Sequence, residues 1–306
     1  MVENVSFEFD LNNIEITKFG VWIREEENLQ AYLVRTGERT KTVISNMLHD
    51  TVELMGKRSR NESNKPLECY NPAEEYKGEI YLITEDRELD SKIRELYEAE
   101  NLAENTSFIY ELEKLFAYFA VFMDDKNRNL VGLKKARGFT NISNKSILGW
   151  VDGTLDITSQ RTFPLDSNFD LIMDCKLTHI LRPAAFESLA DLQQVILNCV
   201  ESNLTEIASD LPSIDFESVL NYSQTHLTAA RKIASIKKRE LRGISIDLLK
   251  KYCLIDEVTF EDKGNKISPV KGKEMGLLKA LNRDLGEVEL IPNQPEHYNI
   301  FSKKPL

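Results

Sequence analysis

The sequence predicts an α+β protein with a central antiparallel sheet, a mixed N-terminal module and a mainly helical, basic C-terminal third. Apolar residues alternate between turn signals over residues 115–181, which is typical of short antiparallel strands. After residue 183 the apolar spacing changes to three and four, the helical period. The charge also changes: residues 1–130 hold 16 Lys+Arg and 27 Asp+Glu (net −11), whereas residues 222–283 hold 14 and 7 (net +7).

The length and composition indicate a protein of two domains. At about 150 residues per domain, 306 residues predict two, which we place at 1–110, an acidic α/β module, and 111–306. With 42% apolar residues the chain can bury a core. Its net charge of −11 argues against nucleic-acid binding over the whole surface but leaves room for a local basic patch. The four cysteines have no CxxC spacing, which excludes zinc-ribbon and disulfide-rich classes.

The N-terminal part predicts strands, a helix and a loop. Residues 7–11, 21–23 and 31–33 alternate as in strands, and residues 40–54 have helical spacing. Residues 56–78 are polar and predict a long loop, followed by a short strand over 79–83. Asp90 is expected to cap a helix that runs to about residue 101. We find no signal peptide and no apolar stretch of about 18 residues, so a cytoplasmic protein is expected.

The middle of the chain predicts a sheet of four to six antiparallel strands. The dense apolar run over 115–123, a polar turn and the segment LVGLKK form a hairpin pattern. The Asp152 and Gly153 pair predicts a second hairpin over residues 150–157. Short apolar runs follow up to residue 181. One helix is then expected from Pro183 to about Val200, with others over 213–222, 224–242 and 245–252. A strand, a helix and a hairpin close the chain.

The helix over 224–242 carries a row of cations. At about 100° per residue, the small and aliphatic residues around Ile233 share one side, so that side can pack on the protein. Lys237 and Glu240 fall on that apolar side, where they must pair or reach out to solvent. Five cations lie on the opposite side: Arg231, Lys232, Lys238, Arg239 and Arg242. Such a row suits phosphates, an acidic surface of this chain or a partner, or anionic lipid. Smaller clusters are Lys134, Lys135 and Arg137, and Lys57, Arg58 and Arg60.

Catalytic motifs are missing from the sequence. It contains no P-loop, GxGxxG, HExxH or GxSxG pattern, and its four histidines are far apart. A metal-dependent nuclease needs clustered acids at strand ends, and Asp170 and Asp174 with nearby Lys176 are a weak version of that pattern. The simpler interpretation is that these are turn and capping residues. We therefore expect a protein that is not an enzyme, without catalytic residues, metal or cofactor.

One stretch resembles a known family. It runs from LVGLKKARG to TFPLDSNFDLIMDCKLTHILRPAAFESL, with Phe169–Asp170 before one short strand and Phe186–Glu187 opening a helix. This order is similar to that of the KwaB family, the soluble component of the two-protein Kiwa anti-phage defence system. The resemblance covers about residues 115–300. It implies a DNA-binding effector that blocks phage replication beside KwaA, a multi-pass membrane protein at the inner membrane, and it supplies no catalytic residue.

Together these observations predict an anti-phage effector that binds double-stranded DNA largely through phosphate contacts. Its expected partner is a membrane protein resembling KwaA, its expected location is peripheral to the inner membrane, and its expected state is a homodimer or larger, because tethered binders gain from multivalency. The alternatives are a nuclease using Asp170 and Asp174 and a non-catalytic interaction adaptor. The predicted DNA-binding residues are Arg231, Lys232, Lys238, Arg239, Arg242, Lys134, Lys135 and Arg137.

Overall fold

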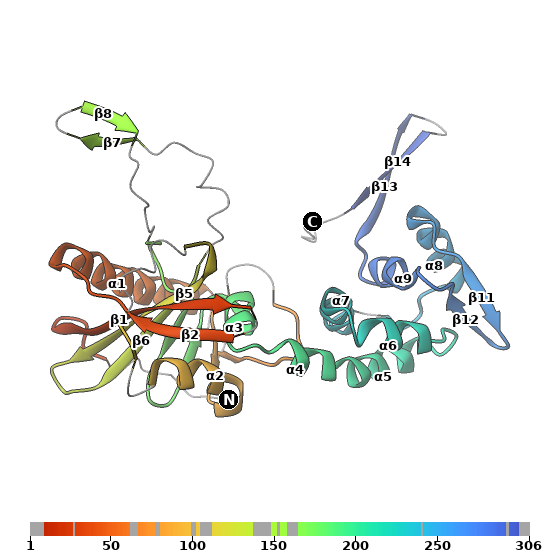
Figure 1. Cartoon of the computed structure of the whole chain (residues 1–306). Coiled ribbons are helices and arrows are strands. Elements are labelled where there is room, and N and C mark those ends of the chain that lie inside the picture. Colours follow the sequence, from red (N-terminus) through yellow and green to blue (C-terminus); the bar gives the residue numbers. More distant parts are fainter. Residues whose placement is uncertain are drawn as a thin grey trace. The chain divides into compact units, whose positions relative to one another are not determined.

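The computed structural model describes two compact units of the chain (Figure 1). The described residues are 9–26, 28–61, 67–76, 80–98, 102–104, 112–136, 148–151, 154–157, 165–239, 241–291 and 294–299. The first unit, here called the sheet unit, comprises Met1–Tyr70 and Lys77–Asp191. The second, the helical unit, comprises Asn71–Tyr76 and Leu192–Leu306. The expected α+β class is confirmed.

The sheet unit is built on one sheet of eight strands. Their order is β2-β1-β5-β6-β9-β10-β4-β3, and every neighbouring pair is antiparallel except β3 and β4. The strands are β1 (Ile14–Glu25), β2 (Asn28–Leu33), β3 (Glu68–Cys69), β4 (Leu82–Thr84), β5 (Leu115–Asp124), β6 (Asn129–Lys135), β9 (Leu171–Met173) and β10 (Thr178–Ile180). The sheet is larger than the expected four to six strands because strands of the N-terminal part extend it.

The division predicted between residues 110 and 111 falls inside this sheet. β1 pairs with β5 from Ile14 opposite Asp124 to Ile23 opposite Leu115, so strands from both sides of the predicted division share one ladder. The contacts of the chain change near residue 191 instead, where the sheet unit ends and the helical unit continues. Pairing between distant strands, which local patterns do not encode, produces this difference.

Helices cover the sheet on both faces (Figure 1). On α1 (Glu38–Asn61), Ile44, Met47 and Leu48 lie three and four residues apart and point to one side. They share a buried cluster with Tyr118 and Phe122 of β5. The other face is approached by α2 (Arg87–Glu98) and α3 (Pro183–Leu189). Because β5 is buried on both faces, its sequence is a continuous apolar run rather than an alternation.

Two predictions in this unit need correction. Asp90 does not cap α2, which begins at Arg87; it lies within the helix, is buried, and accepts hydrogen bonds from Arg94 and Thr178. The region expected to be a loop over residues 56–78 holds the end of α1 and the short strand β3. The Asp-Gly hairpin is confirmed as β7 (Leu148–Val151) paired with β8 (Thr154–Ile157), although Asp152 and Gly153 themselves lie outside the described residues.

The helical unit consists of short helices and two hairpins. The helices are α4 (Gln193–Asn198), α5 (Val200–Asp210), α6 (Glu217–Ser223), α7 (Leu227–Lys237), α8 (Ile246–Cys253) and α9 (Glu274–Leu281). The hairpins are β11 (Phe260–Lys263) with β12 (Lys266–Pro269), and β13 (Leu285–Ile291) with β14 (Gln294–Asn299). In the described part of the chain, no helix combines the length and the apolar character needed to cross a membrane.

Several predicted helices are shorter than expected. The segment from Pro183 to Val200 is divided among α3, α4 and the start of α5. The division between α3 and α4 lies at Asp191, whose φ of 54° is left-handed and cannot continue an α-helix. Pro183 is the first residue of α3, as predicted. The helix expected to reach residue 242 ends at Lys237, where the amide of Arg239 donates to the carbonyl of Ile236. Arg239 and Arg242 therefore follow the helix rather than belong to its face.

Candidate functional site

The packed side of α7 is as the sequence predicts. Ala230, Ile233, Ala234 and Ile236 are all buried. Lys237, which falls on this apolar side, forms an ion pair with Glu206 of α5 at 2.9 Å. The aliphatic side chains therefore attach α7 to the unit, and Lys238 and Arg242, which follow the helix, are exposed.

An acidic segment of the N-terminal half lies against these cations. It is the segment Asn71–Tyr76, here called the acidic strap, which belongs by its contacts to the helical unit. Arg231 donates through Nη1 to the carbonyl of Glu74 at 3.0 Å. The ammonium of Lys238 lies 2.7 Å from Oε2 of Glu74 and 5.2 Å from the ring centre of Tyr76. One carboxylate, one carbonyl and one aromatic ring thus occupy the space beside two of the predicted DNA-binding cations.

The strap is a compact turn with its own hydrogen bonds. The side chain of Asn71 accepts from the amide of Ala73 at 3.0 Å, and its carbonyl accepts from the amide of Glu74 at 3.0 Å. The hydroxyl of Tyr76 accepts from the amide of Asn71 at 2.8 Å. Asn203 of α5 donates to the carbonyl of Ala73 at 2.9 Å. These local bonds hold the backbone of Glu74 in one place.

The remaining predicted cations of this unit also have acceptors. Lys232 forms an ion pair with Asp284, and both side chains are largely buried. Nε of Arg242 lies 2.9 Å from Oδ1 of Asp210, although the Arg242 side chain is 82% exposed. Nε of Arg239 donates to the Asn282 side chain at 3.4 Å. All five cations of the row therefore meet oxygen atoms of the same unit, and Lys232, Lys238 and Arg242 meet carboxylates, which is one of the alternatives that the sequence leaves open.

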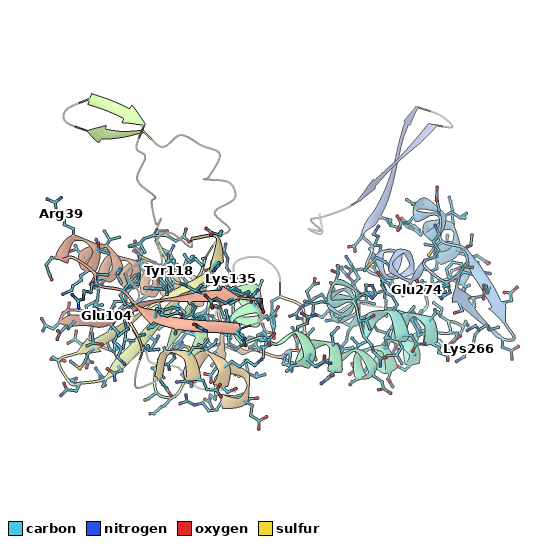
Figure 2. All side chains as sticks on the ribbon, in the orientation of Figure 1. Arg39, Glu104, Tyr118, Lys135, Lys266 and Glu274 are labelled. Carbon is cyan, nitrogen blue, oxygen red and sulfur yellow. The ribbon has the colours of Figure 1, made fainter. Side chains whose placement is uncertain are left out.

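The Lys134 and Lys135 cluster is separated by the alternation of β6. Lys134 lies on the α1 side opposite Tyr118, with its side chain 5% exposed, and its ammonium is 2.9 Å from Asp170 and 3.5 Å from Asp166. Since it is buried and paired, it cannot meet a phosphate at the surface. Lys135 points to the other face, where its ammonium donates to Ser188 of α3 at 2.6 Å (Figure 2). Arg137 lies outside the described residues.

Lys135 shares an aromatic ring with a second cation. The guanidinium carbon of Arg24 lies 3.9 Å from the ring centre of Phe116, and the Lys135 ammonium lies 5.6 Å from the same centre. Burial lowers the pKa of Lys135, and the neighbouring positive charge of Arg24 lowers it further. Two cations beside one ring form a local positive surface on the sheet unit.

The two acids of the nuclease alternative lie at opposite ends of β9. Asp170 binds Lys134 and lies 3.5 Å from the guanidinium of Arg182. Asp174 accepts hydrogen bonds from the amides of Lys176 and Leu177, both at 2.6 Å. Burial opposes the ionisation of Asp174, but His179 and these amides outweigh it and lower its pKa to about 2. Within the described ranges, no group of three or more His, Cys, Asp or Glu side chains could hold a metal ion.

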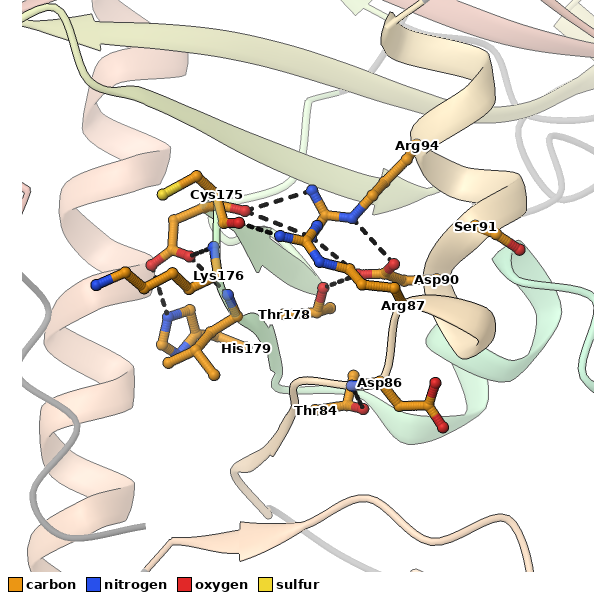
Figure 3. Close-up of polar contacts among 12 residues, drawn as sticks. Thr84, Asp86, Arg87, Asp90, Ser91, Arg94, Cys175, Lys176, Thr178 and His179 are labelled. Atoms are coloured by element: carbon orange, nitrogen blue, oxygen red, sulfur yellow. Dashed lines mark hydrogen bonds and ion pairs between the residues drawn. The ribbon is translucent and has the colours of Figure 1, made fainter.

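A polar network that the sequence did not predict ties α2 to the β9–β10 turn (Figure 3). Arg94 lies 2.9 Å from Asp90 and donates to the carbonyl of Asp174 at 3.3 Å. Thr178 donates to Asp90 at 2.6 Å. Arg87 donates to the carbonyl of Cys175. Asp90 and Arg94 at i and i+4 on a helix are a visible signal, but the carbonyl partners about 80 residues away are not.

The family of the chain follows from a comparison with protein-family models. The model described as "Kiwa protein KwaB-like" matches residues 113–289, more than half of the chain. The chain belongs to this KwaB-like family. The resemblance seen in the sequence is therefore confirmed, and membership makes the protein a component of Kiwa anti-phage defence. No curated protein and no solved structure matches the chain significantly.

The matched range divides the candidate residues of this KwaB-like protein. It includes β5, β6, β9 and β10, and the helical unit from α4 as far as β13, so the predicted DNA-binding residues lie within it. The acidic strap, α1 and α2 lie before it. The acceptor Glu74 is thus outside the family match, whereas its partners Arg231 and Lys238 are inside.

Proposed function

We propose that this KwaB-like protein binds double-stranded DNA through phosphate contacts and acts beside a multi-pass membrane protein resembling KwaA. The family membership carries this proposal. The cations that follow α7 support it, because Lys238 and Arg242 are 46% and 82% exposed. Affinity of this kind comes from the release of counterions and falls steeply with salt.

The relative strength of the ion pairs decides which cations are available to bind phosphate. An exposed ion pair contributes only about 0.2–1 kcal/mol, so a polyanion can displace Glu74 from Lys238 and Asp210 from Arg242. The largely buried pair of Lys232 with Asp284 costs more to separate, and we assign it a structural role. Lys134 is left out of the proposed interface for the same reason. Lys135 and Arg24 form a second, separate surface on the sheet unit.

A salt series of DNA gel shifts tests the helical-unit surface. We expect the double variant Lys238→Glu and Arg242→Glu to bind duplex DNA more weakly. The slope of log affinity against log salt concentration should become less steep by about two, because two phosphate contacts are lost. A matched control changes two exposed cations of the sheet unit, Arg39→Glu and Lys126→Glu, and should bind as the wild type does. Equal affinity of both double variants would remove this surface from the proposal.

The same proposal assigns no catalytic step to the protein. Asp170 and Asp174 are each bound to neighbouring groups and lie at opposite ends of β9. We expect plasmid DNA to stay intact during incubation with the pure protein and Mg²⁺. Cleavage that disappears in Asp174→Asn would instead establish the nuclease.

An interaction adaptor is the second candidate, and the acidic strap favours it. The contacts of Glu74 and Tyr76 with Arg231 and Lys238 support it, because they place an acidic segment of this chain on that surface. A partner with a similar segment would use the same chemistry. Absence of a DNA shift even at low salt, together with binding of an acidic partner, would favour the adaptor over DNA binding.

The membrane partner and the oligomer complete the proposal. Residues 1–130 carry a net charge of −11, which suits the Lys- and Arg-rich cytoplasmic loops of a membrane protein. We expect the protein to sediment with membranes only when the KwaA-like partner is co-expressed, and to be released by high salt. Light scattering of the purified protein should give at least twice the mass of one chain, 35.2 kDa. A monomer in solution would contradict the oligomer.

A further inference from the structure

A cavity of about 820 Å³ lies in the sheet unit, on the face opposite α1. Its floor is one row of residues across four neighbouring strands: Lys18 pairs with Val121, Val121 with Val131, and Val131 with Met173. Directly paired residues in a sheet point to the same face, so these side chains are neighbours. The floor is therefore apolar in its centre and cationic at one end.

Two turns and one helix form the walls. The turn between β5 and β6 contributes Asn127 and Arg128, and α2 contributes Arg94 and Tyr97. The turn between β9 and β10 contributes residues 174–177. The network of Figure 3 fixes this last wall, because Arg94 and Arg87 bind carbonyls of that turn. In the turn between β5 and β6, Arg128 is held by an ion pair with Asp124 at 2.6 Å. Rigid walls of this kind reduce the cost of ordering a ligand.

The charge of the lining favours an anion. Four cations line the cavity, Lys18, Arg94, Arg128 and Lys176, against two carboxylates, Glu98 and Asp174. Arg94 and Arg128 already have carboxylate partners, whereas Lys18 and Lys176 are exposed and enter no ion pair among the described residues. Lys18 comes from β1 and Lys176 from the turn after β9, so a ligand anion can be held at either end of the floor.

We propose that this cavity binds a mononucleotide, with its base over Val121, Val131 and Met173 and its phosphates at Lys18 or Lys176, at one end of that row. The volume lies in the range of small-molecule sites, about 300–1,000 Å³, and is too small for a duplex. The ring of Tyr97 supplies a surface for the base, and the amides of Asn127 and Asn129 supply hydrogen-bond donors and acceptors. The site shares no residue with the DNA-binding surfaces proposed above and does not depend on them.

Calorimetry with the full-length protein tests the proposal. ATP, GTP, CTP and UTP are titrated separately without metal, beside inorganic tripolyphosphate and the matching nucleosides. We expect at least one nucleotide to bind, and to bind more tightly than tripolyphosphate or its nucleoside. The double variant Lys18→Ala and Lys176→Ala should weaken binding about tenfold, since it removes the charged contact at either end of the floor. The control variant Arg39→Ala and Lys251→Ala removes two exposed cations that do not line the cavity. It should bind the nucleotide as tightly as the wild type does.

A cysteine in the cavity wall supplies a second, site-specific readout. Cys175 lines the cavity and is exposed, and Cys69 is exposed elsewhere in the same unit. A bound nucleotide should slow alkylation of Cys175 and leave that of Cys69 unchanged, as measured by mass spectrometry. The proposal is overturned by no binding of any of the four nucleotides at millimolar concentration. It is also overturned by equal binding of tripolyphosphate, or by binding that neither protects Cys175 nor weakens in the double variant.

Discussion

The predicted cations of the helical unit and two lysines of the sheet unit lie in opposite electrostatic settings. In the helical unit, Lys232, Lys238 and Arg242 each meet a carboxylate from another part of the unit. In the sheet unit, Lys18 and Lys176 line a cavity without forming an ion pair within the described residues. The helical unit is the more basic in sequence, yet much of its charge is already neutralised. The number of cations in a segment is therefore a poor measure of the charge that it offers to a ligand.

The largest expected effect comes from Lys134, the buried lysine in the described part of the sheet unit. Lys134→Ala leaves Asp170 buried without its ammonium partner, and we expect a loss of about 3–5 kcal/mol in the free energy of unfolding. Urea denaturation measures it. The double variant Lys134→Met and Asp170→Asn removes both charges and should recover part of the loss. A change below about 1 kcal/mol for Lys134→Ala would show that this pair behaves like an exposed one.

The next largest effect is expected in the pH dependence of stability, through Asp174 of the sheet unit. Its pKa falls from 3.8 to about 2 on folding, so the unfolded chain takes up the proton first as the pH is lowered. The stabilisation is present above pH 4 and is lost as the pH falls to about 2. Because the side chain is 32% exposed, we expect about 1–2 kcal/mol rather than the full shift. Asp174→Asn should lack this component; an unchanged profile between pH 4 and 2 would contradict the assignment.

Removing the acceptor in the strap tests whether the helical unit restrains its own cations. Glu74→Gln takes the carboxylate away from Lys238 but keeps the carbonyl that Arg231 binds. We expect DNA affinity to rise severalfold, in line with the weak free energy of an exposed pair. The control Glu201→Gln removes an exposed carboxylate of α5 and should raise affinity less. Gel shifts at one salt concentration compare the two; equal effects would reduce the role of Glu74 to net charge.

The smallest effect is expected at the ion pair of Lys237, the lysine that the sequence places on the apolar side of α7. Lys237 and Glu206 are both substantially exposed, at 32% and 54%. Glu206→Gln should change the free energy of unfolding by no more than about 0.5 kcal/mol. Chemical denaturation measures this free energy. A clearly larger loss would show that the pair contributes to the packing of α7 on α5.

Local patterns predicted most elements of the fold. The β5–β6 and β7–β8 hairpins, the start of α3 at Pro183 and the packed side of α7 follow from apolar spacing and turn residues. Helix ends were less predictable: the left-handed φ of Asp191 divides a segment whose apolar spacing is continuous. Asp90 is typical of a helix cap by residue type, but its buried partners place it inside α2.

The candidate sites could be predicted only in part. The cations around α7 are visible in the sequence because they depend on residue type and helical spacing. The cavity in the sheet unit is not, because its floor joins residues 18, 121, 131 and 173 through the pairing of four strands. Likewise, no spacing relates Lys135 to Arg24, which meet at the ring of Phe116.

The sequence by itself determined the α+β class, the hairpins, the apolar side of α7 and the family, because these depend on neighbours within a few turns of chain or on a linear pattern of residues. Only the tertiary structure decided which oxygen each cation meets. Glu74 lies 157 residues before Arg231, and Asp284 lies 52 residues after Lys232. Electrostatic interactions decay over ångströms in space, so the charge that a surface offers depends on how distant segments fold together.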